Sequence, residues 1–157
     1  MSASPPASPR LDVAEAPVSS SLLRLVRAHV LLGTRMFAEI GLAPPQELIL
    51  LRLAERGPLP QSEIVEFLQR DRSTISSTLG SMERGGLIRR TPSATNRRAL
   101  VVTLTDAGLA LCPAAREVWA RLERIAFGHL AAETRAELTS AMDASRAALF
   151  TAGRRLA

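Results

Sequence analysis

The chain of 157 residues contains one cysteine, no tyrosine and no lysine, and aromatic residues make up only 3% of it. The single cysteine, Cys112, excludes an intramolecular disulfide framework and fits a reducing compartment. A small aromatic share beside 46% hydrophobic residues favours helices packed through Leu, Ala, Val and Ile over a β-sandwich. The composition therefore predicts a mainly α protein.

Long apolar runs are also missing. No segment approaches the ~18 consecutive apolar residues of a membrane span, and the N-terminus lacks a basic stretch followed by an apolar core. We therefore expect a cytoplasmic protein with no membrane partner. The length suits one modest domain with attached helices.

Groups that could carry catalysis or bind metal are scarce. His29 and His129 are the only histidines and Cys112 is the only thiol, so the sequence offers no set of metal ligands and no nucleophile with an acid–base partner. It also has no glycine-rich phosphate loop. We expect neither an enzyme nor a bound metal or cofactor.

All 20 basic residues are arginine, against 15 acidic residues, and the formal net charge is +5. A basic excess of this size favours a polyanionic partner. The excess is concentrated between residues 70 and 98, where seven arginines face only Asp71 and Glu83. This segment alone accounts for the charge of the whole chain.

Helical spacing predicts most of the chain's organisation. Residues 1–17, rich in Pro, Ser and Ala, are typical of a disordered tail. A helix over 19–40 carries two apolar stripes and must be covered on two sides. Shorter helices are predicted over 46–56 and 61–69.

The stretch DRSTISSTLGSMERGGLIRR, residues 71–90, predicts a further helix with Asp71 as its N-cap and a double glycine at its end. Three apolar residues form its buried edge: Ile75, Leu79 and Met82. The opposite face is small, hydroxylic and ends in a cation: Ser73, Ser77, Gly80 and Arg84. Gly80 in the helix interior costs on the order of 1 kcal/mol in helix propensity.

Two strands, 87–91 and 99–104, are predicted to flank a loop with arginines at its tip. Arg89 and Arg90 point to opposite sides of their strand, so only one of them is expected to face a phosphate. A long helix should run from Thr105 toward residue 130, interrupted and kinked near Pro113. A last helix, about 132–152, is expected to bury Leu138, Met142 and Leu149.

Helix, tight turn, helix and basic hairpin follow one another in the order of a winged helix-turn-helix. Over about residues 41–112 the chain resembles the MarR (multiple antibiotic resistance regulator) transcription factors. The similarity runs through GLAPPQELILLRLAERGPLPQSEIVEFLQRDRSTISSTLGSMERGGLIRR and NRRALVVTLTDAGLAL. The chain departs from the family's common pattern at Asn96, where an acidic residue is usual, and at Ser77 and Ser81, where many members carry arginine.

This resemblance implies a mainly α fold with a small β hairpin, in which a winged helix-turn-helix core (43–104) lies between an N-terminal dimerisation helix (18–42) and C-terminal dimerisation helices (105–157). It implies a homodimer that binds double-stranded DNA, with the 72–84 helix in the major groove and the wing in the minor groove. It also implies a small-molecule effector pocket between the dimerisation and DNA-binding parts.

Short hydroxylic side chains let a helix approach base edges, and arginines neutralise phosphates. We therefore predict the following DNA contacts: Arg72, Ser73, Thr74, Ser76, Ser77, Ser81, Arg84, Arg97 and Arg98. Candidates for effector binding are His29, Met36 and Trp119, although a packing role is the favoured interpretation of each.

The favoured function is a ligand-responsive repressor that binds a pseudopalindromic operator as a homodimer. One alternative is a dimeric interaction or architectural module with weak, non-specific DNA affinity, which Ser77 and Ser81 motivate. A narrower alternative makes Cys112 a peroxide sensor, against the more common role of a buried cysteine as a small apolar residue.

Overall fold

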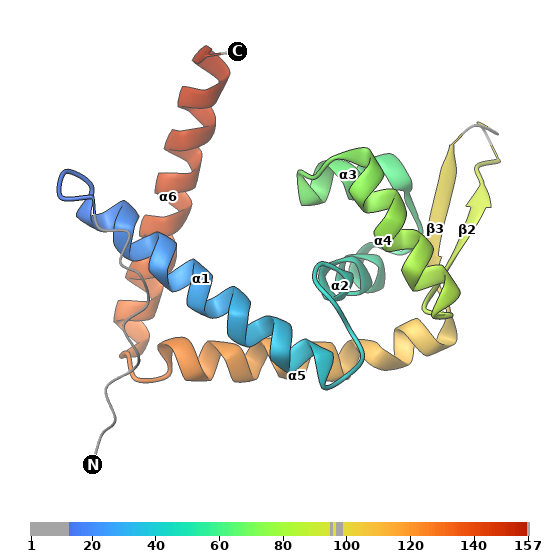
Figure 1. Ribbon diagram of the computed structural model, residues 1–157, viewed down its shortest axis with the longest axis horizontal. Helices are drawn as coiled ribbons and strands as arrows, with labels where there is room; N and C mark the ends of the chain where they lie inside the picture. The colour runs from blue at the N-terminus through green and yellow to red at the C-terminus, as the bar shows by residue number, and fades with distance from the viewer. Residues whose placement is uncertain (1–12, 95, 97–98, 157) are drawn as a thin grey trace. The chain divides into compact units, whose positions relative to one another are not determined.

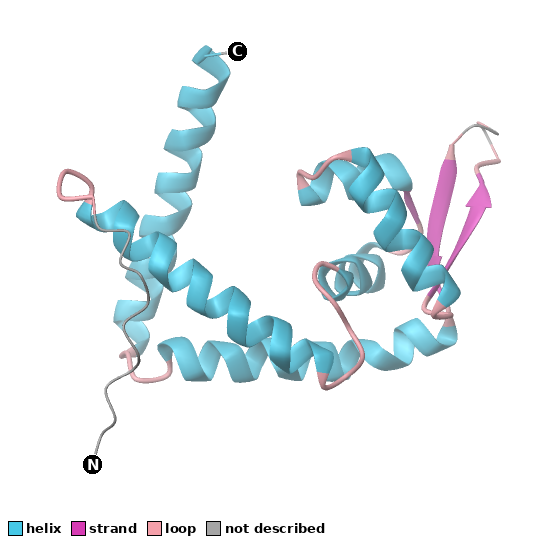
Figure 2. Cartoon of the chain, viewed as in Figure 1, coloured by secondary structure: helices cyan, strands magenta, loops and turns pink. Residues whose placement is uncertain are grey.

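A computed structural model describes residues 13–94, 96 and 99–156 of the chain. It contains six helices and three short strands in this part of the chain (Figures 1 and 2). The helices are α1 (Pro17–Ala38), α2 (Gln46–Arg56), α3 (Gln61–Leu68), α4 (Arg72–Arg84), α5 (Asp106–Phe127) and α6 (Ala132–Leu156). The strands are β1 (Leu59–Pro60), β2 (Ile88–Pro92) and β3 (Leu100–Leu104). The predicted mainly α class with a small hairpin is confirmed.

The chain forms two compact units that divide within α5, between Trp119 and Ala120. The first unit holds α1 to α4, the sheet and the first part of α5. The second holds the end of α5 and all of α6. The predicted helix-turn-helix and wing therefore lie together in the first unit.

The strands form one antiparallel sheet in the order β1-β3-β2. The β2–β3 pairing is the predicted hairpin, with Arg90 opposite Val102. The two-residue strand β1 was not predicted, because a dipeptide that contains proline has no strand signature. It is found only because Leu59 pairs with Val102 on the far side of β3.

Most helix boundaries lie within two residues of those predicted, and α2 matches them at both ends. At the start of α1, Pro17 occupies the first turn, where its fixed φ suits a helix and its missing N–H is not needed. Residues 13–16 form a turn tied to this helix by a 3.0 Å bond from the Val13 backbone N to Ser20 Oγ. This end of the predicted tail is therefore structured, while residues 1–12 lie outside the described chain.

The predicted interruption at Pro113 is wrong, because α5 continues through it. Proline removes one backbone donor, and here the carbonyl that loses its partner belongs to Leu109. Leu109 is 56% exposed and Pro113 is also exposed, so water can bond to that carbonyl. The remaining hydrogen bonds of this 22-residue helix are sufficient to maintain it.

The core of the first unit includes apolar side chains from α2, α3, α4 and the strands β2 and β3. Ile75, Leu79 and Met82 of α4 are at most 1% exposed, which confirms the predicted buried edge. They are buried together with residues of α2, α3 and the sheet: Ile49, Leu50, Leu53, Ile64, Ile88 and Val102. Each such side chain contributes roughly 1.5–3 kcal/mol on burial.

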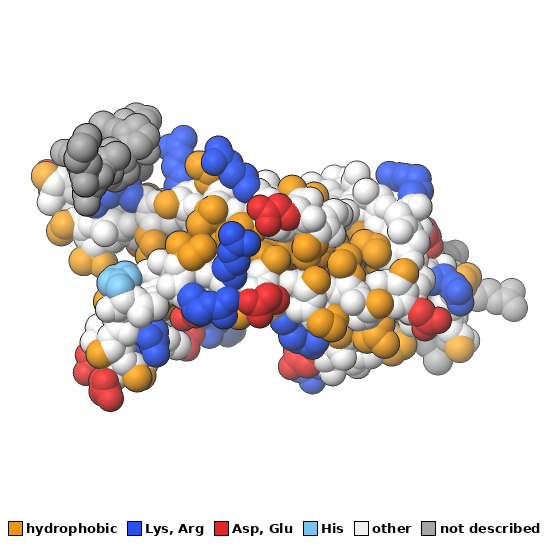
Figure 3. Space-filling view, turned by 90° about the horizontal axis from the view of Figure 1, so that it is seen from below, with side chains coloured by type: hydrophobic (Ala, Val, Ile, Leu, Met, Phe, Trp, Pro, Cys, Tyr) orange, Lys and Arg blue, Asp and Glu red, His pale blue; other side chains and the backbone are white. Residues whose placement is uncertain are grey.

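Other apolar side chains remain on the surface of the chain, interspersed with charged ones (Figure 3). On α1 seven are 40% or more exposed: Val18, Leu22, Leu23, Leu25, Val26, Val30 and Leu31. On α6 the predicted burial of Met142 and Leu149 is not found, since these side chains are 43% and 73% exposed. Among the described helices, none is both long and apolar enough to cross a membrane.

Glu47 is an exception to the apolar interior. It lies in the first turn of α2 and is only 5% exposed, and its Oε2 atom has no hydrogen-bond partner among the described residues. Burial raises the pKa of this carboxyl above its usual value, because the charged form loses its hydration.

The substitution Glu47→Gln should therefore increase the free energy of unfolding at pH 7. Because the pKa of Glu47 is higher in the folded than in the unfolded chain, ionisation destabilises the fold as pH rises above the unfolded value of ~4.3. The gain should shrink as pH falls toward 4. Urea unfolding at pH 7 and pH 4 measures it, with the exposed Glu66→Gln as control. A variant less stable than the parent at pH 7 would show that the charged form is favoured.

Candidate nucleic-acid interface

Helix α4 begins at the predicted cap. Asp71 Oδ1 accepts hydrogen bonds from the backbone N of Thr74 at 2.8 Å and from Ser73 Oγ at 2.5 Å, and its Oδ2 accepts one from Thr74 Oγ1 at 2.6 Å. These bonds hold the pKa of Asp71 far below its usual range. Since Ser73 and Thr74 both donate to the cap, their hydroxyl oxygens are left to act as acceptors.

The rest of the predicted DNA-contacting face is exposed, with one correction. Arg72, Ser77, Ser81 and Arg84 are exposed and Ser76 is half-buried. Gly80, expected on this face, is buried. A Cβ atom there would lie 3.4 Å from Arg84 Nη1 and 3.7 Å from Arg90 Nη2, so two guanidinium groups cover the glycine. The contact with Arg84 follows from i,i+4 spacing on the helix, whereas the contact with Arg90 comes from a strand and could not be predicted from the helix alone.

The two strand arginines point to opposite sides, as the alternation predicted. Arg89 is exposed, whereas Arg90 forms an ion pair with Glu83 of α4, with 2.7 Å between Arg90 Nη2 and Glu83 Oε2. Arg90 Nε donates to the same oxygen at 2.9 Å, and the backbone N of Arg90 donates to Glu83 Oε1 at 2.9 Å. Hydrogen bonds from Arg90 lower the pKa of Glu83. The predicted wing-tip contacts, Arg97 and Arg98, lie outside the described residues.

Two of the three effector candidates come together. The rings of His29 and Trp119 have centroids 5.8 Å apart, and Phe37, which was not predicted, lies 5.6 Å from the Trp119 ring. The buried Nε1 atom of Trp119 has no hydrogen-bond partner among the described residues. Met36 is buried.

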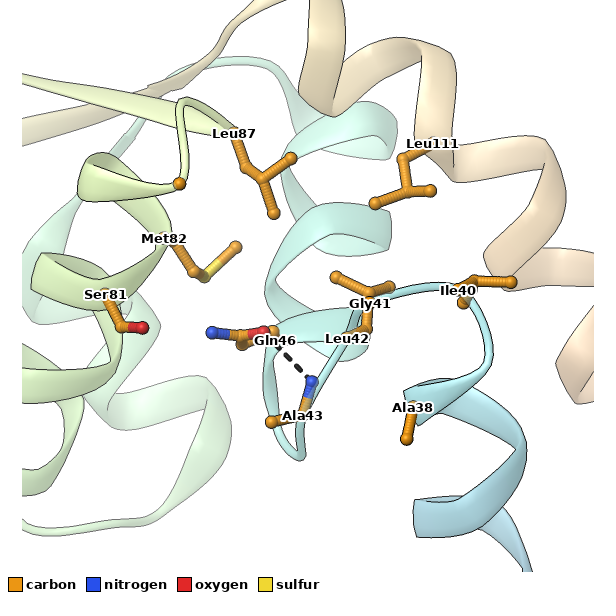
Figure 4. Close-up of a pocket in the computed structure, with 11 residues that line it drawn as sticks. Ala38, Ile40, Gly41, Leu42, Ala43, Gln46, Ser81, Met82, Leu87 and Leu111 are labelled. Atoms are coloured by element: carbon orange, nitrogen blue, oxygen red, sulfur yellow. Dashed lines mark hydrogen bonds between the residues drawn. The ribbon is translucent and has the colours of Figure 1, made fainter.

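A pocket of about 590 Å³ lies elsewhere in the first unit, bordered by the end of α1, the start of α2, the end of α4 and α5. Its lining includes Gln46, Ser81, Met82 and Leu111 (Figure 4). Gln46 Oε1 accepts a 3.0 Å hydrogen bond from the backbone N of Ala43 at its edge. None of the three predicted effector residues lines this pocket. Sequence spacing could not identify it, because its walls come from four separate elements.

Cys112 is 1% exposed, and its Sγ lies 3.4 Å from the carbonyl oxygen of Gly108. Burial raises the pKa of the thiol. Since the thiolate is the nucleophile that attacks peroxides, this environment argues against a sensor role and favours the packing role of the residue.

Comparisons with known proteins agree with this architecture. Residues 42–100 match the model of the MarR family. The HTH-type transcriptional regulator PecS of Dickeya dadantii is 33% identical over 106 residues, which are 66% of this chain and 64% of PecS. The repressor NicR of Pseudomonas putida is 26% identical over 134 residues, which are 83% of this chain and 85% of NicR. Residues 42–100 therefore carry the match to the MarR family, and the chain spans slightly less than two thirds of the length of PecS.

Solved structures of MarR regulators share the fold. AbsC from Streptomyces coelicolor superposes with a TM-score of 0.79 at 24% identity, covering 90% of this chain and 97% of AbsC. A MarR family regulator from Listeria monocytogenes, solved in complex with a 26mer DNA, gives a TM-score of 0.76 at 23% identity, covering 84% of this chain and 88% of that one. At identities below 25%, these TM-scores show a common fold.

The surroundings of Gly80 predict that alanine is tolerated at this position. In the substitution Gly80→Ala the new Cβ would make ordinary van der Waals contacts, at 3.4 and 3.7 Å, with the ends of two flexible side chains. Alanine should therefore raise the free energy of unfolding by roughly 0.5–1 kcal/mol through helix propensity. Thermal unfolding measures the gain.

Gly86→Ala is the matched control. Gly86 follows α4 with a φ of 72°, a left-handed conformation that alanine adopts only at a cost. This variant should be less stable than the parent. If Gly80→Ala were destabilising as well, the guanidinium groups above Gly80 could not yield to a methyl group.

Proposed function

We propose that this protein is a transcriptional regulator of the MarR family, which binds DNA sequence-specifically and acts as a ligand-responsive repressor. The observation that carries the proposal is the exposed face of α4. The helix is capped by Asp71 and buried along its opposite edge, and it presents Ser77 between two exposed arginines, Arg72 and Arg84. Short side chains there allow the helix backbone to approach base edges in a major groove.

The spacing of the two arginines supports this placement. Arg72 and Arg84 begin and end α4, and at ~1.5 Å per residue they lie about 18 Å apart along the helix axis. The major groove is ~12 Å wide, so both guanidinium groups can reach phosphates that border it. Because Ser73 and Thr74 donate to Asp71, direct donation to phosphate falls first to Arg72, Ser77 and Arg84.

The pocket beside α4 gives a route for an effector to act. A small molecule held there would contact Ser81 and Met82 on α4 and also residues at the end of α1. Such a ligand would change DNA affinity to the extent that it binds one position of α4 better than another. In this proposal the pocket takes the effector-binding role for which His29, Met36 and Trp119 were the candidates from the sequence.

The exposed apolar side chains of α1 and α6 support a homodimer, because patches of this kind on soluble proteins usually mark interaction surfaces. In a dimer two copies of α4 would enter successive major grooves about 10 bp apart on a pseudopalindromic operator.

Fluorescence anisotropy on the DNA upstream of the protein's own gene tests regulation. The wild-type protein should prefer this duplex over a scrambled one by roughly 10³-fold or more. Arg72→Ala, Arg84→Ala and the double variant Arg97→Ala/Arg98→Ala should weaken binding. The slope of log K against log[salt] should fall by about 1 for each arginine–phosphate interaction that a variant removes. Arg116→Ala, an exposed arginine on α5, is the control.

Equal, weak binding to both duplexes would favour a second candidate function. Ser77 and Ser81 replace the arginines that many family members carry on this helix, and a dimer with few base contacts could serve as an interaction or architectural module. Genome-wide selection of bound DNA fragments would then show whether the protein prefers an operator elsewhere in the genome or has no preferred sequence.

Sedimentation velocity tests the dimer. The wild-type chain should sediment as a dimer at micromolar concentrations, and Leu149→Glu should shift it toward monomer, because a charge would replace an apolar side chain at the interface. Thr151→Glu, at a different angle on α6, is the control and should sediment like wild type. A monomeric wild-type chain would contradict the proposed dimer.

A further inference from the structure

Helix α4 and the wing strand β2 are joined by one pair of side chains. Glu83 lies in the last turn of α4 and Arg90 in the middle of β2, and their side chains are 35% and 20% exposed. We propose that this pair is a positioning clamp, which fixes the wing relative to the recognition helix so that both meet DNA in one geometry. The inference rests on the proposed DNA-binding function.

The carboxylate of Glu83 holds both the side chain and the backbone of Arg90. Its Oε2 accepts from Nη2 at 2.7 Å and from Nε at 2.9 Å, and its Oε1 accepts from the backbone N at 2.9 Å. β2 is an edge strand of the sheet, and an edge strand leaves alternate N–H groups without a strand partner. Glu83 supplies the missing acceptor, so the strand itself is tied to α4.

Gly80 lies beneath this contact. A Cβ at this position would lie 3.7 Å from Arg90 Nη2, so the guanidinium group extends across the surface of α4 at the glycine. A methyl group would fit there, but a longer side chain would occupy the place of the guanidinium. The unusual glycine in the middle of α4 thus leaves room for the arginine.

The pairing separates the roles of the two strand arginines. Arg90 uses two of its guanidinium nitrogens on Glu83, and the charge of the pair is neutral. Arg89 points to the other side of β2 and forms no ion pair within the described residues. Arg90 therefore acts on DNA through the position of the wing, not by direct contact with phosphate.

The substitution Glu83→Gln tests the clamp. A role in positioning the wing and a purely electrostatic role of Glu83 predict opposite changes in DNA affinity. Removing a negative charge beside a polyanion should strengthen DNA binding if the residue acts only through the long-range field. Loss of the clamp should weaken binding roughly tenfold. Glu66→Gln, which removes an exposed carboxylate from α3, is the matched control and should bind as tightly as wild type or slightly tighter.

Two arginine variants distinguish positioning from phosphate contact. Arg90→Gln should weaken binding while the salt slope stays at the wild-type value, whereas Arg84→Ala should lower the slope by about 1. Arg90→Lys keeps the charge but loses the planar fork, so it should not restore affinity. Tight binding by Glu83→Gln together with a reduced slope for Arg90→Gln would overturn the clamp and make Arg90 a phosphate contact.

Amide hydrogen exchange without DNA separates failure of the clamp from failure of the proposed function. In Glu83→Ala the Arg90 amide should exchange at least about tenfold faster than in wild type, since its acceptor is gone, while Glu66→Ala should leave it unchanged. Unchanged protection in Glu83→Ala would overturn the clamp. If protection disappears but the wild-type protein does not select its DNA, the proposed function fails and the structural link between α4 and β2 stands.

Discussion

The geometry of the candidate interface depends on the burial of one edge of α4. Ile75 and Leu79 are fully buried and Met82 is 1% exposed, and together they contribute several kcal/mol at roughly 1.5–3 kcal/mol each. Rotation of the helix about its axis would return these side chains to water. The orientation of Ser77 and Arg84 therefore follows from the apolar side chains behind them.

Apolar packing does not determine where α4 begins and ends, and polar contacts define these two ends. Serine and threonine favour a helix only weakly, since their hydroxyl groups compete for backbone partners. At the start of α4, Asp71 directs two of these hydroxyl groups into the cap. At its end, the carboxylate of Glu83 accepts a hydrogen bond from the backbone N of Arg90 in the neighbouring strand β2. A helix of mediocre composition is thus defined at both ends by carboxylates whose pKa values are lowered by the bonds they accept.

Features set by short-range sequence patterns could be predicted, whereas those set by distant residues could not. The bounds of α2, the Asp71 cap and the buried edge of α4 follow from spacing and capping within a few residues. Strand β1 exists only through its pairing with Val102. The burial of Gly80 depends on Arg90, which the turn after α4 brings back onto the helix. The continuity of α5 at Pro113 depends on exposure, which the sequence does not specify.

In the proposed function, the hydroxylic face of α4 and the apolar surfaces of α1 and α6 depend on each other. A helix that presents few arginines to DNA has few charge-assisted contacts, so one copy would gain limited affinity from a half-site. Joining two copies makes the second binding event intramolecular and raises the overall affinity without any additional interaction. That gain in affinity requires the two copies of α4 to stay at a fixed distance from each other. On the proposal of a homodimer, the apolar faces would set the distance between the two subunits, and the Glu83–Arg90 pair would set the geometry within each.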